Sequence, residues 1–150
     1  MTSFHHLFLL AFSIFNFLIF LKGFYESKYK NNAFGLTRPL VFIGVFVWAD
    51  AVIFGLFWVM ASLITYFLQD WYLFLLITSI FWVVRSLGEV IYWLNQQFST
   101  LKRNPIENLP WQSIFHNDSV WFVHQIIWQC VMAISLVFTI YLSHMWLQTF

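Results

Sequence analysis

Residues 61–80 read ASLITYFLQDWYLFLLITSI, and they place two apolar runs on either side of one polar pair, Gln69 and Asp70. The run before this pair begins near Pro39, and the run after it continues to about Phe98. Each run is longer than the roughly 20 apolar residues that an α-helix needs to cross a bilayer. So short a link permits only a tight antiparallel turn. We therefore expect a hairpin of two membrane-spanning helices over residues 39–68 and 71–98.

Two further apolar runs flank this hairpin, at about residues 4–24 and 119–148. The first has lysines after it and no basic residue before it, which is the reverse of a cleavable signal peptide. The last follows three residues whose side-chain oxygens suit a helix N-cap. The sequence thus predicts an all-α integral membrane protein, folded as one antiparallel domain of four transmembrane helices. The lysines are Lys22, Lys28 and Lys30, and the capping residues are Asn117, Asp118 and Ser119.

The composition agrees with a lipid environment. Of the 150 residues, 61% are apolar and only 9% are charged, whereas about a quarter of the residues of a soluble domain are charged. A net charge of +1 without a basic face argues against nucleic acid as a partner. The lone Cys130 cannot form an internal disulfide or a thiol pair. No phosphate-binding loop or nucleophile elbow is present, so we expect no cofactor and do not favour an enzyme.

The basic residues of the loops predict the orientation in the membrane. Cytoplasmic loops carry an excess of Lys and Arg close to the ends of the spans. The first and third loops hold such residues, whereas the second loop and both ends of the chain hold none. We therefore predict a plasma or inner membrane protein with both termini on the non-cytoplasmic side. The basic residues are Lys22, Lys28, Lys30 and Arg38 in the first loop and Lys102 and Arg103 in the third.

Three ionisable residues interrupt the predicted spans: Asp50, Arg85 and Glu89. Each costs about 2.5 to 3.5 kcal/mol near the centre of a membrane helix. Arg85 and Glu89 are four residues apart, which allows an ion pair on one helical face. Folding the chain at its two-residue link brings Asp50 level with Glu89. Two carboxylates would then share one guanidinium, and the second negative charge would need a proton, a cation or another basic group.

Other polar residues fall at a similar depth. His124 is a candidate for the missing positive charge because its ordinary pKa of about 6.5 lies near neutrality. The amides on the first and fourth spans can donate hydrogen bonds to the carboxylates. We expect a polar layer in the inner half of the bundle, which acts either as a structural network or as a proton or ion site. Its predicted members are Asn16, Asp50, Arg85, Glu89, His124, Gln125 and Gln129.

Small residues predict where helices approach each other. Ala51 and Gly55 form a small-xxx-small pair, which is typical of closely packed membrane helices. Gly88, beside Ser86, predicts a second close approach next to the charged turn. Both sites favour contact between neighbouring helix backbones.

Histidines near the predicted outer ends of the spans form a second candidate cluster, of His5, His6 and His144. Facing imidazoles can bind a metal ion or haem iron. An interfacial histidine is more commonly an amphipathic side chain that meets water, and the recognised metal-binding spacings are missing. Metal ligation is therefore kept as the minor interpretation.

Three functional hypotheses follow from these patterns. The first is a small non-enzymatic membrane protein, a structural or accessory subunit held by the Asp50, Arg85 and Glu89 network. Such a subunit would contact lipid and assemble as a homo-oligomer or within a larger complex. The second is a proton-coupled transporter or channel subunit that uses Asp50 or Glu89. The third is a membrane enzyme in which His124 works with a carboxylate as acid and base.

Overall fold

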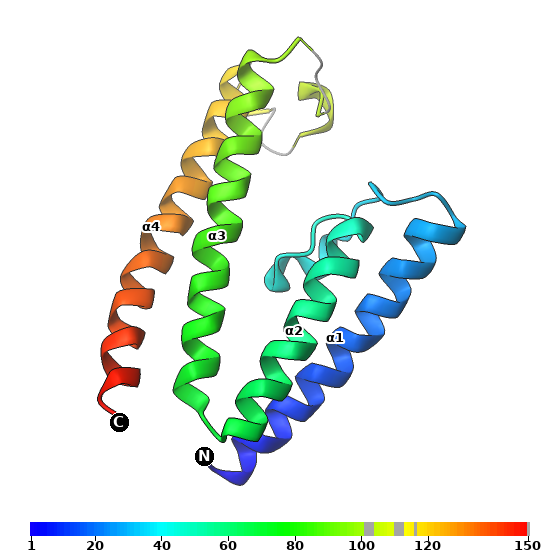
Figure 1. Cartoon of the computed structure of the whole chain (residues 1–150). Coiled ribbons are helices and arrows are strands. Elements are labelled where there is room, and N and C mark those ends of the chain that lie inside the picture. Colours follow the sequence, from blue (N-terminus) through cyan, green and yellow to red (C-terminus); the bar gives the residue numbers. More distant parts are fainter. Residues whose placement is uncertain (101–103, 110–112, 116, 150) are drawn as a thin grey trace. The chain divides into compact units, whose positions relative to one another are not determined.

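The computed structural model describes residues 1–100, 104–109, 113–115 and 117–149, so Lys102 and Arg103 lie outside the described residues. The described chain is helical apart from its connections (Figure 1). Four of its helices are long and apolar enough to cross a membrane. In order, the elements are α1 (Ser3–Tyr29), the 3-10 helix η1 (Arg38–Ile43), α2 (Trp48–Leu68), α3 (Trp71–Phe98), the 3-10 helix η2 (Ile106–Asn108) and α4 (Ser119–Leu147).

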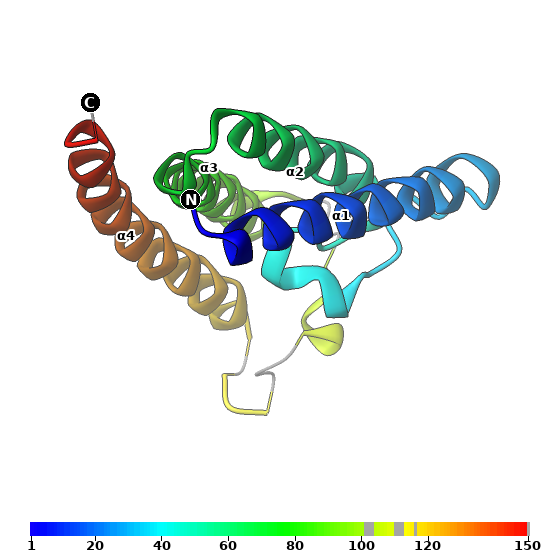
Figure 2. The same cartoon turned by 90° about the horizontal axis from the view of Figure 1, so that it is seen from below.

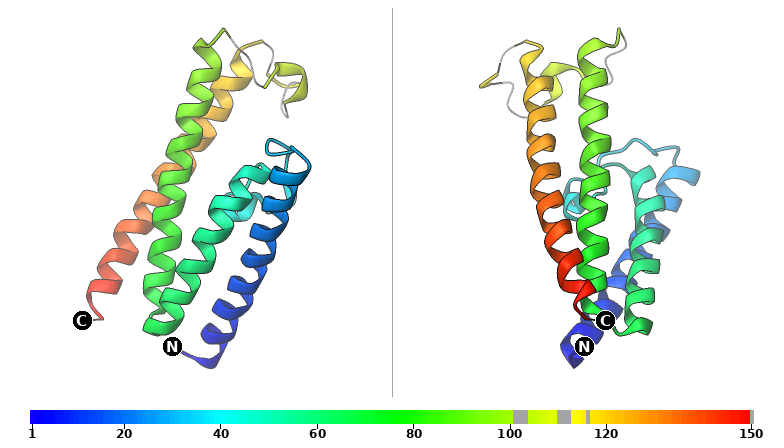
Figure 3. Two further views of the ribbon diagram at one scale, coloured as in Figure 1. Left: turned by 45° about the vertical axis from the view of Figure 1, so that its right-hand side comes forward. Right: turned by 60° about the vertical axis from the view of Figure 1, so that its left-hand side comes forward.

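The chain divides into two units, residues 1–77 and 78–150, and each is described by itself. In the first unit α1 and α2 run antiparallel and side by side (Figure 2). In the second unit most of α3 packs antiparallel against α4 (Figure 3). The predicted all-α class, with antiparallel packing within each helix pair, is therefore confirmed.

Small residues bring α1 and α2 together. A Cβ atom added to Gly55 would lie 3.0 Å from the backbone nitrogen of Phe20 and 3.1 Å from the carbonyl oxygen of Asn16. One added to Gly23 would lie 2.6 Å from the Cβ of Ala51. The helices thus touch through backbone where side chains are smallest, as the Ala51 and Gly55 pair predicts.

The prediction that the second span begins at Pro39 is wrong, because α2 begins at Trp48. Pro39 instead lies in the first turn of η1, which ends at Gly44 in the left-handed conformation (φ 79°). From there the chain turns back toward the start of α2. Hydropathy cannot separate these two elements, since both are apolar. We call residues 36–47 the re-entrant hairpin.

The re-entrant hairpin lies along the α1 and α2 pair, and several of its backbone groups are hydrogen-bonded within the first unit. The indole nitrogen of Trp58 donates to the carbonyl oxygen of Ile43 at 2.9 Å, in a buried contact. Trp58 lies ten residues along α2 from Trp48, or about 15 Å at 1.5 Å per residue. Thr37 closes the hairpin through its hydroxyl, which donates to the carbonyl of Val45 at 2.9 Å.

The link between α2 and α3 forms the predicted tight turn. Gln69 adopts a left-handed conformation (φ 53°), and its amide donates to carbonyls of the last turn of α2. The Asp70 carboxylate accepts from the amide of Leu73 at 2.9 Å and so caps α3. Helix α3 has the predicted bounds, whereas α1 runs on to Tyr29. Asp118 is at the N-cap of α4, but its side chain makes no capping hydrogen bond among the described residues.

Candidate functional site

The residues predicted to form one polar layer belong to both units. Asp50 lies in the first unit and Arg85 in the second, and each unit is described by itself, so the contact between these two side chains stays a prediction. Most of these residues make contacts within their own unit. The first unit holds Asn16 and Asp50, and the second holds Arg85, Glu89, His124, Gln125 and Gln129.

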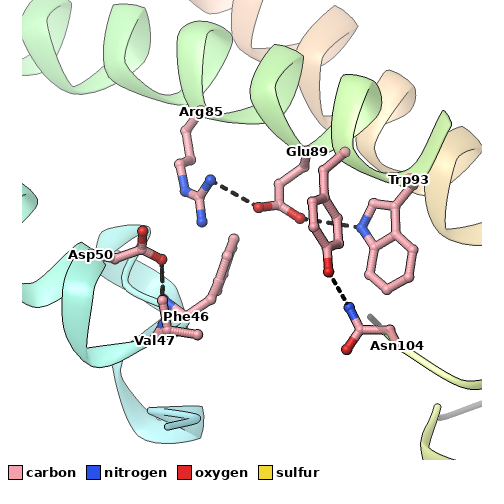
Figure 4. Close-up of polar contacts among 8 residues, drawn as sticks. Phe46, Val47, Asp50, Arg85, Glu89, Trp93 and Asn104 are labelled. Atoms are coloured by element: carbon pink, nitrogen blue, oxygen red, sulfur yellow. Dashed lines mark hydrogen bonds and ion pairs between the residues drawn. The ribbon is translucent and has the colours of Figure 1, made fainter. Parts of the chain in front are cut away.

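Asp50 has a local role at the start of α2. Its Oδ2 atom accepts hydrogen bonds from the backbone amides of Phe46, at 3.0 Å, and Val47, at 3.3 Å (Figure 4). A carboxylate in the first helical turn is also stabilised by the helix dipole. The sequence did not reveal this role, because a helix that began at Pro39 would have placed Asp50 in its interior.

Asn16 lies on the face of α1 that packs against α2, and it is fully buried. Its amide nitrogen donates to the carbonyl oxygen of Phe12, one turn earlier, at 2.8 Å. Its Oδ1 atom has no hydrogen-bond partner among the described residues. Within the first unit Asn16 is therefore a residue of the helix interface.

Arg85, Glu89 and Trp93 form a polar stripe on α3 at intervals of four residues. An Arg85 guanidinium nitrogen lies 2.8 Å from Oε1 of Glu89. The indole nitrogen of Trp93 donates to the other carboxylate oxygen at 3.2 Å (Figure 4). Both side chains of the ion pair keep 13% of their surface exposed. The predicted pair is thus present, but within the second unit it is a partly exposed contact along one helix and no buried charged network.

His124 carries the stripe across to α4. Its imidazole lies against the Trp93 indole, with ring centroids 4.4 Å apart. Its Nδ1 atom is 2.8 Å from the carbonyl oxygen of Val120. A carbonyl only accepts, so Nδ1 bears a proton in this contact. No described residue donates to Nε2, and the ring lies tilted against Trp93; a role for His124 as the positive charge beside a carboxylate stays a prediction.

Amide contacts continue the connection between α3 and α4. The side chain of Gln97 donates to Gln125 Oε1 at 2.6 Å. Gln125 is therefore part of the site, whereas Gln129 is exposed. Beyond them the backbone carbonyl of Asn104 accepts from the indole nitrogen of Trp121 at 3.0 Å. The sequence analysis missed Trp93 and Gln97, although both continue the four-residue spacing from Arg85 and Glu89.

The other end of this helix pair has a smaller polar contact. The Ser79 hydroxyl donates to the carbonyl of Ser135 at 2.9 Å and lies 2.8 Å from the Thr139 hydroxyl. Between the two ends, α4 makes no approach to Gly88, since a Cβ atom added there would meet nothing within 4 Å. The predicted close approach at Gly88 is thus wrong for the second unit. At both ends a polar side chain of α3 reaches α4, and the two backbones do not touch each other at these contacts.

The outer histidines have neighbours of other kinds. His5 accepts a hydrogen bond from the amide of Thr2 and stacks on Trp71, with ring centroids 4.4 Å apart. His6 packs edge-on against Tyr66, and His144 pairs with the Gln148 side chain. In neither unit do the described residues group three His, Cys, Asp or Glu side chains for a metal ion. Metal ligation by His5, His6 and His144 stays a prediction.

Comparisons with protein-family models, with curated proteins and with solved structures found no match for this chain. Function must therefore be argued from the site itself. The described residues offer two features of this kind, the polar connection of α3 with α4 and the close packing of α1 with α2.

Proposed function

We propose that this chain is a non-enzymatic integral membrane protein, a structural or accessory subunit whose polar residues hold its helices together. One observation carries the proposal: polar side chains within the spans are engaged in structural contacts. Asp50 caps α2, Glu89 is bound by Arg85 and Trp93, and Gln97 joins α3 to α4. In a transport site we would instead expect polar side chains that face a water-filled cavity, where a substrate or ion can bind to them.

The energetics support a structural role. Arg and Glu each cost about 2.5 to 3.5 kcal/mol in the middle of a membrane helix, and their pairing offsets part of that cost. A hydrogen bond between membrane helices contributes about 0.6 kcal/mol on average. The contacts at Gln97 and Ser79 are of this kind. Apolar side chains of α4 remain exposed for contact with lipid or with another subunit.

Proton flux into liposomes tests the proposal. Purified protein is reconstituted with an enclosed pH-sensitive dye, and an inward proton gradient is imposed together with a potassium diffusion potential. We expect the dye signal to match that of empty liposomes for the unsubstituted chain and for Glu89→Gln. Flux in the unsubstituted protein that disappears in Glu89→Gln would overturn the structural proposal.

A proton-coupled transporter or channel subunit is the second candidate, and His124 is the observation that favours it. Its Nε2 atom has no donor among the described residues, and its ring touches the indole that binds Glu89. On this hypothesis His124→Gln abolishes proton uptake by the same liposomes, while the amount of folded protein stays the same. His144→Gln, a histidine near the end of the same helix, is the matched control. Equal uptake in both variants would exclude a proton-transfer role for His124.

The proposed orientation places both termini outside the cytoplasm. The basic residues of the first and third loops support it. A C-terminal alkaline phosphatase fusion should then be active and a C-terminal green fluorescent protein fusion dark. The opposite pair of results would reverse the topology.

A further inference from the structure

Basic side chains gather where α1 ends and α2 begins. The basic residues of this region are all exposed: Lys22, Lys28, Lys30 and Arg38. One of them is neutralised, since the Lys30 ammonium lies 2.9 Å from the Glu26 carboxylate. No described carboxylate lies within ion-pair distance of the other three. We call those three the basic collar: Lys22, Lys28 and Arg38.

The lysines of the collar lie over aromatic rings. The Lys22 ammonium is 5.1 Å from the centre of the Trp48 ring, and that of Lys28 is 5.1 Å from the centre of the Phe24 ring. Lysine stems lie along apolar surface in this way while their charged heads reach the membrane interface. Trp and Tyr are enriched at that same depth. The collar is therefore built like a segment that meets lipid headgroups.

Arg38 belongs to the same region through the re-entrant hairpin. It opens η1, and the two legs of the hairpin are bridged between Leu36 and Val47, next to Trp48. Trp48 in turn donates its amide to the carbonyl of Gly35 at 3.2 Å. The loop that carries Arg38 is thus fixed to the helix start over which Lys22 lies.

We propose that the basic collar binds the phosphate of anionic phospholipids. Positive charges without a carboxylate partner, held at the interface by aromatic rings, complement that headgroup in charge and in depth. Exposed apolar side chains beside the collar, Phe34 (81%) and Leu36 (69%), are suited to the adjoining acyl region. A soluble phosphate would gain nothing from them. This inference does not depend on the proposed subunit function.

Native mass spectrometry of the full chain, released from micelles with phosphatidylglycerol or phosphatidylcholine, tests the proposal. We expect the unsubstituted protein to bind phosphatidylglycerol in preference. A basic residue near an anionic membrane surface contributes about 1 kcal/mol, which corresponds to about fivefold in affinity. Lys22→Gln, Lys28→Gln and Arg38→Gln should each raise the apparent Kd for phosphatidylglycerol by about this factor.

The control removes a neighbouring pair without changing net charge. The double variant Glu26→Gln with Lys30→Gln deletes the neutralised lysine together with its partner. It should leave the preference for phosphatidylglycerol unchanged, and circular dichroism should show all variants folded. Equal binding of the two lipids by the unsubstituted protein would overturn the proposal. So would an equal loss in the control, or competition by free glycerol phosphate at the lipid concentration.

Discussion

The two helix pairs of this chain are held together in different ways. Between α1 and α2 the backbones approach closely, because Gly23 and Gly55 leave no room for larger side chains. Between α3 and α4 polar side chains make the described connections, through Gln97 with Gln125 and Ser79 with Ser135. Lipid is as apolar as the helices, so apolar burial alone does not drive either association. Packing fit dominates the first pair, and hydrogen bonding contributes to the second.

The largest expected effect is steric and confined to the first pair. Gly55→Leu would place its Cβ atom against the backbone of Asn16 and Phe20, which cannot rotate away. We expect a loss of about 3 kcal/mol in unfolding free energy, the upper range for overpacking. Denaturation with sodium dodecyl sulfate, followed by circular dichroism, measures it. Gly88→Leu is the matched control, and a loss there equal to that of Gly55→Leu would contradict the contrast between the pairs.

An intermediate effect is expected at the re-entrant hairpin. Trp58→Phe keeps an aromatic ring but removes the donor to the carbonyl of Ile43. A buried acceptor without a partner costs about 2 kcal/mol. We expect faster hydrogen exchange at the hairpin amides, such as that of Thr37, together with a lower Tm. Trp82→Phe is the control, since no described residue accepts from its indole. Unchanged exchange in Trp58→Phe would show that packing alone holds the hairpin.

The smallest effect is expected for a single polar contact of the second pair. Ser79→Ala removes the α3 hydroxyl that contacts the Ser135 carbonyl and the Thr139 hydroxyl on α4. The average contribution of such a bond predicts a loss of about 0.6 kcal/mol. Ser135→Ala should change less, because its backbone carbonyl makes this contact. Steric trapping in micelles resolves differences of this size. A loss of unfolding free energy that is larger in Ser135→Ala than in Ser79→Ala would contradict a contact between the Ser79 hydroxyl and the Ser135 backbone carbonyl.

The sequence predicted all four long helices but misplaced the start of α2 and the end of α1. Helix α3 has the predicted bounds because Gln69 and Asp70 supply turn and capping chemistry that can be read locally. The start of α2 was misplaced, since Gly44 breaks an apolar stretch without any change in hydropathy. That error also hid the capping role of Asp50. Long-range contacts such as Trp58 with Ile43 have no local signal at all.

The candidate site was predicted in part. Spacing alone identified the pair of Arg85 and Glu89, because residues four apart share a helical face. Sequence cannot show that the His124 ring would lie against Trp93, since this contact depends on the register of two helices. Nor could it show that Gly88 would lack a neighbour on α4. A small residue permits close approach but does not supply the helix that approaches.

The re-entrant hairpin also constrains how the chain can be made. Synthesis proceeds from the N-terminus, so Ile43 emerges from the ribosome before Trp58, whose indole donates to its carbonyl oxygen. An irregular segment with open backbone groups does not rest in hydrocarbon. A hairpin placed within the bilayer would therefore need Trp58 to emerge, and α2 to form, before its Ile43 carbonyl has this partner. Such a hairpin would enter the bilayer together with the second helix, as one unit of insertion.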